Sequence, residues 1–295
     1  MFGAVLARWI EAEFDRLGQP ADFRVVEVGA GPGTLARSIL HAAPQWTDRY
    51  IAVELSAAQR AMHPDGVQSI AALADAQQIR GVVIANELLD NLPFRLAVFD
   101  GGWREAVVEV AGDGSLTEHL VAAPEEWGWL PKPAPHGARV PMQHRASDWV
   151  VAMQSQLVGG TVLAFDYFTA LTAELAAMPW RDWLRTYRGH ERGEHYLRNV
   201  GQQDITTQVC LDQLPAPSAV RSQAQFLARW GINDLVAEGK AQWLAEASAP
   251  SVASLRMRSR ISEAETLLDP SGLGAFLAVE WPCANLRDRG SERHG

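Results

Sequence analysis

The feature that most constrains the fold is a short apolar run followed at once by a glycine-rich loop and a helical pattern. Residues 23–28 have the composition of a buried strand, the loop at 29–33 is Gly-Ala-Gly-Pro-Gly, and apolar spacing from Thr34 predicts a helix. Further apolar runs at 50–53 and 81–85 also alternate with helical segments. Strands that alternate with helices are joined by crossovers, so the sequence predicts a parallel sheet covered on both faces.

The rest of the chain completes an α/β domain around this unit. We expect helices at 2–17 and 147–157, a β-meander at about 94–122, a long loop at 124–141, and strands at 161–165, 219–225 and 274–281. Helical spacing with many Trp and Arg residues predicts that 168–215 form a helical insertion. The core is then 1–167 with 216–286, and the polar residues 287–295 form a disordered tail.

Composition excludes several classes of protein. The chain has 295 residues, 47% of them apolar, which is enough to bury a large core. Asp and Glu number 35 against 26 Lys and Arg, and a net charge of −9 argues against nucleic acid as a partner. No apolar stretch is long enough to span a membrane, and we find no signal peptide.

Cysteine and histidine usage bounds the compartment and the metal chemistry. Cys210 and Cys283 form no CxxC pair, which leaves no disulfide framework and favours a reducing, cytoplasmic location. The eight histidines show neither HxxxH nor HExxH spacing, so we expect no metal site.

The loop after the first strand carries the strongest chemical signal. Gly29, Gly31 and Gly33 let the backbone turn sharply and approach a ligand, beside the free N–H groups of the following helix. Glu27 precedes them, and a carboxylate at the buried end of a strand needs a strong hydrogen-bond partner. We predict that Glu27 contacts a cofactor directly or through water; the alternative is a Glu held by loop N–H groups. Thr34 stands where a dinucleotide-binding loop needs glycine, which disfavours an NAD enzyme.

A second acid closes the next strand. Glu54 follows the run at 50–53, where a carboxylate can accept hydrogen bonds from both hydroxyls of a ribose. The alternative is an acid at a helix start beside Ser56, which is placed to cap a helix. We assign Leu55 and Asn86 to the same cofactor site, although Asn86 could equally order the loop after its strand.

Together, the acid, the glycine loop and the second acid resemble the cofactor site of class I S-adenosylmethionine-dependent methyltransferases. The resemblance implies a Rossmann-like fold with a mostly parallel seven-stranded sheet whose last strand is antiparallel. It also implies that S-adenosyl-L-methionine is the cofactor, bound across the carboxyl ends of the strands.

Four further motifs narrow the resemblance. They are Ala-Asn-Glu-Leu-Leu-Asp-Asn-Leu-Pro at 85–93, Leu-Ala-Phe-Asp-Tyr at 163–167, Leu-Arg-Thr-Tyr-Arg-Gly-His at 184–190, and Asn-Val-Gly-Gln-Gln-Asp-Ile-Thr at 199–206. In this order they resemble the MidA/NDUFAF7 (DUF185) family of methyltransferases, and the likeness runs from Phe2 to about Trp281. The mitochondrial member of that family methylates arginine in a subunit of complex I, so the resemblance implies an enzyme acting on protein arginine.

One departure from the family concerns the N-terminus. Family chains usually carry a further segment, with an acidic tyrosine-rich motif near the cofactor, before the position that matches Phe2 and Gly3. Either the start of this chain is truncated, or this branch of the family lacks that wall of the site.

Paired carboxylates are the natural partners of a guanidinium, which is charged at any physiological pH. Glu87, Asp90 and Asp166 follow neighbouring predicted strands at the edge where α/β proteins bind ligands, so we assign them as catalytic residues. The alternatives are a turn residue for Glu87, a cap or turn acid for Asp90, and an anchor for the insertion for Asp166.

Residues in the insertion have both structural and chemical interpretations. His190 could be a base or a residue on a solvated face, and Asp204 to Thr206 favour a helix start over a chemical role. Trp180 and Trp183 favour packing over an aromatic cage.

Three functions remain after these arguments. The first is a cytoplasmic S-adenosylmethionine-dependent methyltransferase acting on protein arginine. The second is the same kind of catalyst acting on oxygen or nitrogen of a small molecule, and the third is a weakly catalytic, cofactor-binding assembly factor. The expected partner is therefore a protein or small-molecule methyl acceptor, neither nucleic acid nor membrane, with a homodimer left open.

Overall fold

The computed structural model describes residues 1–74, 78–189, 191–248 and 251–283. The chain divides into two compact units. The sheet unit comprises Met1–Asn86, Ala152–Phe165 and the described residues from Pro217 onwards, and the meander unit comprises Glu87–Val151 and Asp166–Ala216. His190 and the expected tail at 287–295 lie outside the described residues.

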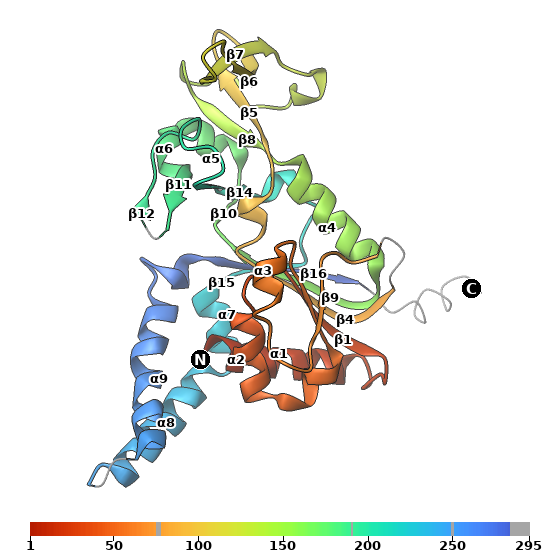
Figure 1. Ribbon diagram of the computed structural model, residues 1–295, viewed down its shortest axis with the longest axis vertical. Coiled ribbons are helices and arrows are strands. Elements are labelled where there is room, and N and C mark those ends of the chain that lie inside the picture. Colours follow the sequence, from red (N-terminus) through yellow and green to blue (C-terminus); the bar gives the residue numbers. More distant parts are fainter. Residues whose placement is uncertain (75–77, 190, 249–250, 284–295) are drawn as a thin grey trace, which may run out of the picture. The chain divides into compact units, whose positions relative to one another are not determined.

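A seven-stranded sheet forms the sheet unit (Figure 1). Its strands are β1 (Phe23–Val28), β2 (Tyr50–Val53), β3 (Gln68–Ile70), β4 (Ile79–Asn86), β9 (Leu157–Asp166), β15 (Ala219–Ser222) and β16 (Leu277–Cys283), in the order β15-β16-β9-β4-β1-β2-β3. The pairs β1–β2, β1–β4, β2–β3 and β4–β9 are parallel, and the last strand, β16, runs antiparallel to β15. The predicted mostly parallel seven-stranded sheet with an antiparallel last strand is confirmed. The strands pair in parallel because the chain leaves β1 through the glycine loop into a helix and returns to the sheet by a crossover.

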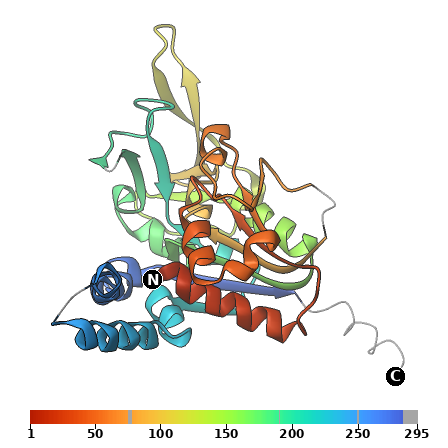
Figure 2. The same ribbon diagram turned by 60° about the horizontal axis from the view of Figure 1, so that its bottom comes forward.

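Helices precede and separate these strands along the chain. They are α1 (Phe2–Arg16), α2 (Thr34–Ala42), α3 (Ala57–Arg60), α4 (His144–Gln156), α7 (Gln223–Arg229), α8 (Ile232–Glu246) and α9 (Val252–Leu268), with 3₁₀ turns η1 (Pro44–Arg49) and η5 (Leu273–Ala275). Trp9 and Ile10 of α1 share one core with Phe23 and Val25 of β1. Each such fully buried side chain stabilises the fold by about 1.5–3 kcal/mol. The helices α8 and α9 pack side by side (Figures 1 and 2).

A four-stranded antiparallel sheet begins the meander unit. Its strands are β5 (Arg95–Phe99), β6 (Trp103–Val110), β7 (Leu116–Ala122) and β8 (Arg139–Met142), in the order β7-β6-β5-β8, with 3₁₀ turns η2 (Leu89–Asn91) and η3 (Glu125–Trp127). The predicted meander is confirmed, whereas β8 begins within the expected loop at 124–141 and ends one residue beyond it. This sheet belongs to the unit that also contains Asp166–Ala216, whereas the sequence predicts it as part of the core with residues 1–167.

The expected helical insertion at 168–215 is wrong. This segment holds only two short helices, α5 (Thr172–Ala177) and α6 (Trp180–Trp183), beside β10 (Phe168–Thr169), β11 (Leu184–Arg188), β12 (Glu191–Arg192), β13 (Asp204–Thr207), β14 (Val209–Cys210) and the 3₁₀ turn η4 (Leu211–Gln213). Leu184 and Thr186 are buried while their neighbours are more exposed, which is the period of two of a strand. Gly189, at φ +64°, supplies the turn after β11.

The expected helix start at Asp204 to Thr206 is likewise a strand. In β13, Thr206 lies opposite Arg185 of β11 in an antiparallel pair. The β-branched run Ile-Thr-Thr favours a pleated strand over a helix. Pairing with β11 therefore outweighs the local pattern that predicts a helix start.

Candidate functional site

A cavity of about 360 Å³ lies in the sheet unit where β1 and β4 end. Its lining comprises Phe2, Gly3, Glu27, Gly29, Ala30, Gly31, Pro32, Thr34, Leu35, Ser38 and Asn86. Its volume falls within the range of small-ligand sites. Four predicted cofactor residues therefore share one cavity: Glu27, Gly29, Gly31 and Asn86.

Left-handed backbone shapes the glycine loop. Gly31 has φ +53° and Gly33 has φ +79°, and Gly33 forms the N-cap of α2. A Cβ at Gly33 would stand 3.0 Å from Pro64 Cδ, and the His63 ring nitrogen Nε2 lies 2.9 Å from the Gly31 carbonyl oxygen. Gly33 therefore does not line the cavity but lets the segment at 63–64 pack against the loop, a contact that no local pattern around His63 indicates.

Glu27 joins the cavity to the core. Its side chain is 3% exposed, and the Tyr50 hydroxyl donates to its Oε2 at 2.6 Å. Burial raises the pKa of Glu27 to about 7, while the hydrogen bonds from Tyr50 and the Ala36 backbone and the charge of Arg37 oppose that rise. The carboxyl is thus satisfied by Tyr50 and by α2, and it lines the cavity as well.

Glu54 holds the glycine loop. Its Oε2 accepts from the Gly31 N–H at 3.0 Å and its Oε1 from the Ser56 N–H at 2.8 Å. Ser56 accepts from the Gln59 N–H, which confirms it as the cap of α3. Neither Glu54 nor Leu55, which is 84% exposed, lines the cavity, so the ribose contact remains a prediction.

Residues from α1 and α2 complete the wall of the cavity, and the sequence did not assign them. Phe2 and Gly3 line it from α1, and Ser38 from α2. A Cβ at Gly3 would lie 2.4 Å from Ser38 Oγ, so this glycine permits a close helix crossing. A glycine inside the apolar face of a helix was the available signal.

Asp166 lies at the end of β9 with its carboxylate fully enclosed. Its Oδ2 accepts from the N–H groups of Leu89 at 2.8 Å and Asp90 at 3.2 Å, and its Oδ1 accepts from the Tyr167 N–H at 2.9 Å. Burial raises the pKa of Asp166 to about 7, and these backbone hydrogen bonds oppose the rise. Asp166 therefore stabilises the turn after β4 by accepting hydrogen bonds from its backbone at Leu89 and Asp90.

Asp90 is packed against Asp166. It is 2% exposed and accepts from the Asn91 side-chain amide at 2.7 Å. Burial, together with the negative charges of Asp166 and Glu87, raises the pKa of Asp90 to about 8. Two buried carboxyls in contact cannot both ionise readily, so the pair retains a proton near neutral pH.

Glu87 is the exposed member of the three carboxylates. It follows β4 with φ +53°, a left-handed conformation that is rare outside glycine. The register of β4 and β9 aligns Asn86 with Phe165, so Glu87 and Asp166 follow aligned strand ends. The sequence correctly predicted that these acids gather there, and the burial of Asp90 and Asp166 favours positioning roles for them.

Aromatic residues around α6 pack as the sequence favoured. Trp183 is 1% exposed, and the guanidinium carbons of Arg139 and Arg181 lie 5.2 and 4.4 Å from the centre of the Trp180 ring. Across the described residues, no three His, Cys, Asp or Glu side chains are arranged so that they could hold a metal ion. In the same residues no helix is long and apolar enough to cross a membrane.

A doubly wound sheet of this strand order, with an acid near the end of its first strand and a glycine loop directly after that strand, defines the Rossmann-like class I methyltransferase architecture. The chain belongs to the family described as "Putative S-adenosyl-L-methionine-dependent methyltransferase", whose model matches residues 5–228. This family assignment confirms the resemblance drawn from the motifs. S-adenosyl-L-methionine is the cofactor of the family, and methyl transfer is its reaction.

Known proteins agree with this assignment. The chain is 24% identical over 252 residues to the "Protein arginine methyltransferase NDUFAF7 homolog, mitochondrial" of Drosophila melanogaster, covering 71% of this chain and about half, 55%, of that relative's length. Two solved structures from Burkholderia thailandensis are each 24% identical and cover 96% of this chain, with TM-scores of 0.80 and 0.81 and 79% and 76% of their own chains covered. The second of these proteins is bound to S-adenosyl-homocysteine. At this identity the two structures establish the fold.

Proposed function

We propose that this protein transfers a methyl group from S-adenosyl-L-methionine to an arginine side chain of another protein. The observation that carries the proposal is the cluster of three carboxylates after β4 and β9, of which one, Glu87, is exposed. The name of the Drosophila relative supports the choice of arginine.

The cavity in the sheet unit fits the cofactor chemically. Glu27 supplies the single carboxyl of its lining, the glycine loop brings backbone close to the ligand, and the start of α2 offers N–H groups. Glu54 would accept hydrogen bonds from the ribose hydroxyls in exchange for its contact with Gly31. When bound, the sulfonium supplies an activated methyl group, so the protein chiefly has to align the acceptor and exclude water.

The carboxylates would hold the acceptor. Glu87 would bind the guanidinium by charge-assisted hydrogen bonds, which suit the planar, always charged arginine side chain. Asp166 and Asp90 would keep the backbone of 89–91 in place and thereby set the position of Glu87. Asn86, which lines the cavity, is joined directly to Glu87 in the chain.

Net charge and the state of the cysteines support a choice of acceptor class and of cellular compartment. A protein acceptor suits a chain with a net charge of −9 better than a nucleic acid does. Both cysteines are free, which supports a reducing compartment, and we propose the cytoplasm.

Replacing Glu87 tests the proposal. Glu87→Gln removes the charge with little change of shape, so methyl transfer to arginine peptides should fall about ten- to a hundredfold while cofactor affinity is kept. Glu125→Gln, a matched change at an exposed position in η3, should leave both unchanged. The measurements are transfer of labelled methyl groups at saturating cofactor, calorimetric affinity for S-adenosyl-homocysteine, and melting temperature.

Three other results would contradict this function. Full activity of Glu87→Gln would remove the carboxylate contact. Label that enters small molecules rather than protein in lysate from a deletion strain would favour a small-molecule acceptor. Wild type that binds cofactor but transfers no label to any acceptor would favour an assembly factor.

A further inference from the structure

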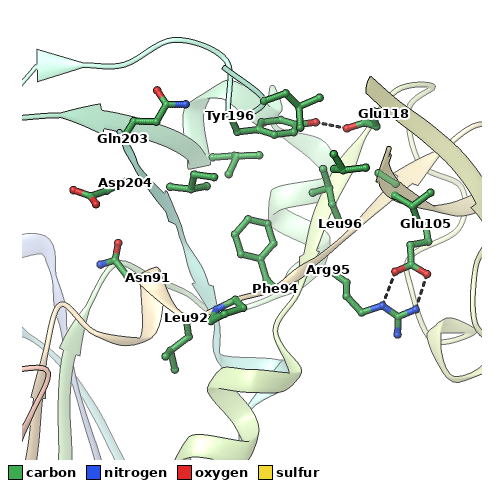
Figure 3. Close-up of a pocket in the computed structure, with 17 residues that line it drawn as sticks. Asn91, Leu92, Phe94, Arg95, Leu96, Glu105, Glu118, Tyr196, Gln203 and Asp204 are labelled. Carbon is green, nitrogen blue, oxygen red and sulfur yellow. Dashed lines mark hydrogen bonds and ion pairs between the residues drawn. The ribbon is translucent and has the colours of Figure 1, made fainter. Parts of the chain in front are cut away.

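A second and larger cavity, of about 730 Å³, lies wholly within the meander unit (Figure 3). Its apolar lining includes Phe94, Leu96, Leu184, Leu197 and Ile205. In Figure 3, Phe94 points into the space, with Asn91 and Asp204 on one side of it and Glu105 and Glu118 on the other.

This cavity, which we call the groove, has a lining with net negative charge. Three carboxylates, those of Glu105, Glu118 and Asp204, line it against the single guanidinium of Arg95. Arg95 pairs with Glu105 at 2.5 Å, and Arg139, which is outside the lining, pairs with Glu118 at 2.7 Å. In the described residues Asp204 has no ion pair, so the groove retains negative charge at its Asp204 side and would attract a cationic ligand.

The apolar surface continues beyond the groove along the β6–β7 hairpin. Val108, Val110 and Leu120 are 52%, 71% and 41% exposed. The pairings Ala106 with Leu120 and Val108 with Glu118 put these side chains on the face that also lines the groove. Such an elongated exposed apolar surface suits a polypeptide better than a compact small molecule.

The groove and the carboxylate cluster both include residues of the 3₁₀ turn η2. Its lining begins at Asn91, which belongs to η2 together with Asp90, and Thr206 of β13 donates to the Asn91 side-chain oxygen at 3.4 Å. The strand β13 is the end strand of its described three-stranded sheet, and an end strand can extend its sheet with an extended segment.

We propose that this groove binds an extended segment of the methyl-accepting polypeptide, one that carries an apolar side chain and a net positive charge. The apolar side chain packs against Phe94, Leu197 and Ile205, and the positive charge lies near Asp204. The proposal rests on the function proposed above, because it supplies the substrate contacts outside the methylated residue.

A peptide library tests the groove without requiring catalysis. The probe is a library of nonapeptides with a fixed central arginine and randomised flanks, and the selected sequence is then labelled with fluorescein for anisotropy. Wild type should select an apolar residue together with lysine or arginine. Ile205→Lys and Asp204→Lys should each weaken the selected peptide about tenfold or more. Leu244→Lys, at an exposed position of α8 in the sheet unit, should not.

The outcomes separate this inference from the proposed function. Tight binding that is lost in both groove variants supports the groove even if no methyl group is transferred, which would count against arginine methylation alone. Peptides that are bound and methylated equally well by wild type and the groove variants would overturn the groove and leave the function standing.

Three further results would also overturn it: retention of no peptide, selection of acidic peptides, or a wild-type dimer that Ile205→Lys dissociates. The last would make a second copy of the chain the occupant. Unchanged melting temperature and S-adenosyl-homocysteine affinity in the variants exclude misfolding as the cause of weaker binding.

Discussion

At the scale of a single residue, Glu27 is both a buried carboxyl and part of the lining of a cavity. It is buried enough for its pKa to reach about 7, yet it lines the cavity that we propose binds the cationic cofactor. Tyr50 and Ala36 stabilise its ionised form, and burial destabilises it. A nearby positive ligand would therefore complete the set of partners that favours the carboxylate.

The pKa of Glu27 predicts how cofactor affinity depends on pH. Because binding of a cation favours the ionised form, affinity for S-adenosyl-L-methionine, whose sulfonium is positively charged, should rise about fivefold between pH 6 and 7 as the fraction of free protein with ionised Glu27 grows. Glu27→Gln should remove this dependence. Calorimetry at pH 6, 6.5 and 7 measures it, and an affinity that is equally flat in wild type would contradict the assignment.

The same shift acts on stability with a definite sign. The folded pKa is raised from 4.5 to about 7, so the native state binds more protons than the unfolded state in that window. The contribution of Glu27 to the free energy of unfolding is therefore greatest below pH 4.5 and is lost as the pH rises to about 7.

At the scale of elements, the central strands of the sheet approach so closely at one level that two positions there have no room for a side chain. Gly81 of β4 and Gly160 of β9 lie opposite each other at φ +143° and +139°. A Cβ at Gly160 would stand 1.7 Å from the Gly81 carbonyl oxygen, and one at Gly81 would stand 2.0 Å from the carbonyl oxygen of Arg24 in β1. Three parallel strands can pair at this level only if the side chains are absent.

Gly160→Ala should therefore destabilise the sheet strongly. We expect the free energy of unfolding to fall by at least about 2 kcal/mol, from backbone strain and the displaced strand. Gly112→Ala is the control, because Gly112 has an ordinary φ and no atom within 4 Å of an added Cβ. Urea denaturation followed by tryptophan fluorescence measures both, and equal midpoints for the two variants would contradict the argument.

At the scale of the whole molecule, each of the two units has a hydrophobic core among its described residues. Trp9, Ile39 and Phe165 belong to the core of the sheet unit, and Trp127 and Trp183 belong to that of the meander unit. Each core can therefore respond to its own ligand, since a ligand stabilises the structure that binds it.

Hydrogen exchange should reveal this division. S-adenosyl-homocysteine at about 100 times its Kd should add about 2.7 kcal/mol to the opening free energy of segments that bind it. Protection should appear at 29–38 and 50–56 in the sheet unit, and exchange of the β6–β7 hairpin, 103–122, should stay unchanged. Slowed exchange in that hairpin without any change in the glycine loop would contradict the location of the cofactor site.

Local patterns in the sequence determined the elements of the sheet and the chemistry placed at their ends. Apolar runs of strand length fixed β1, β2 and β4, and the glycines after β1 fixed the turn into α2, because both depend only on neighbouring residues. Acids that directly follow strands were predictable as a cluster, because parallel strands end at one edge of a sheet.

Features that depend on partners far apart in the chain could be known only once the fold was in place. Thr206 became part of a strand because Arg185 lies opposite it, and β8 formed inside an expected loop because it pairs with β5. Burial separated the exposed Glu87 from the enclosed Asp166, although the sequence gives both the same position after a strand. Pairing and burial join residues far apart in the chain, and a periodicity read over ten or fifteen residues carries no information about them.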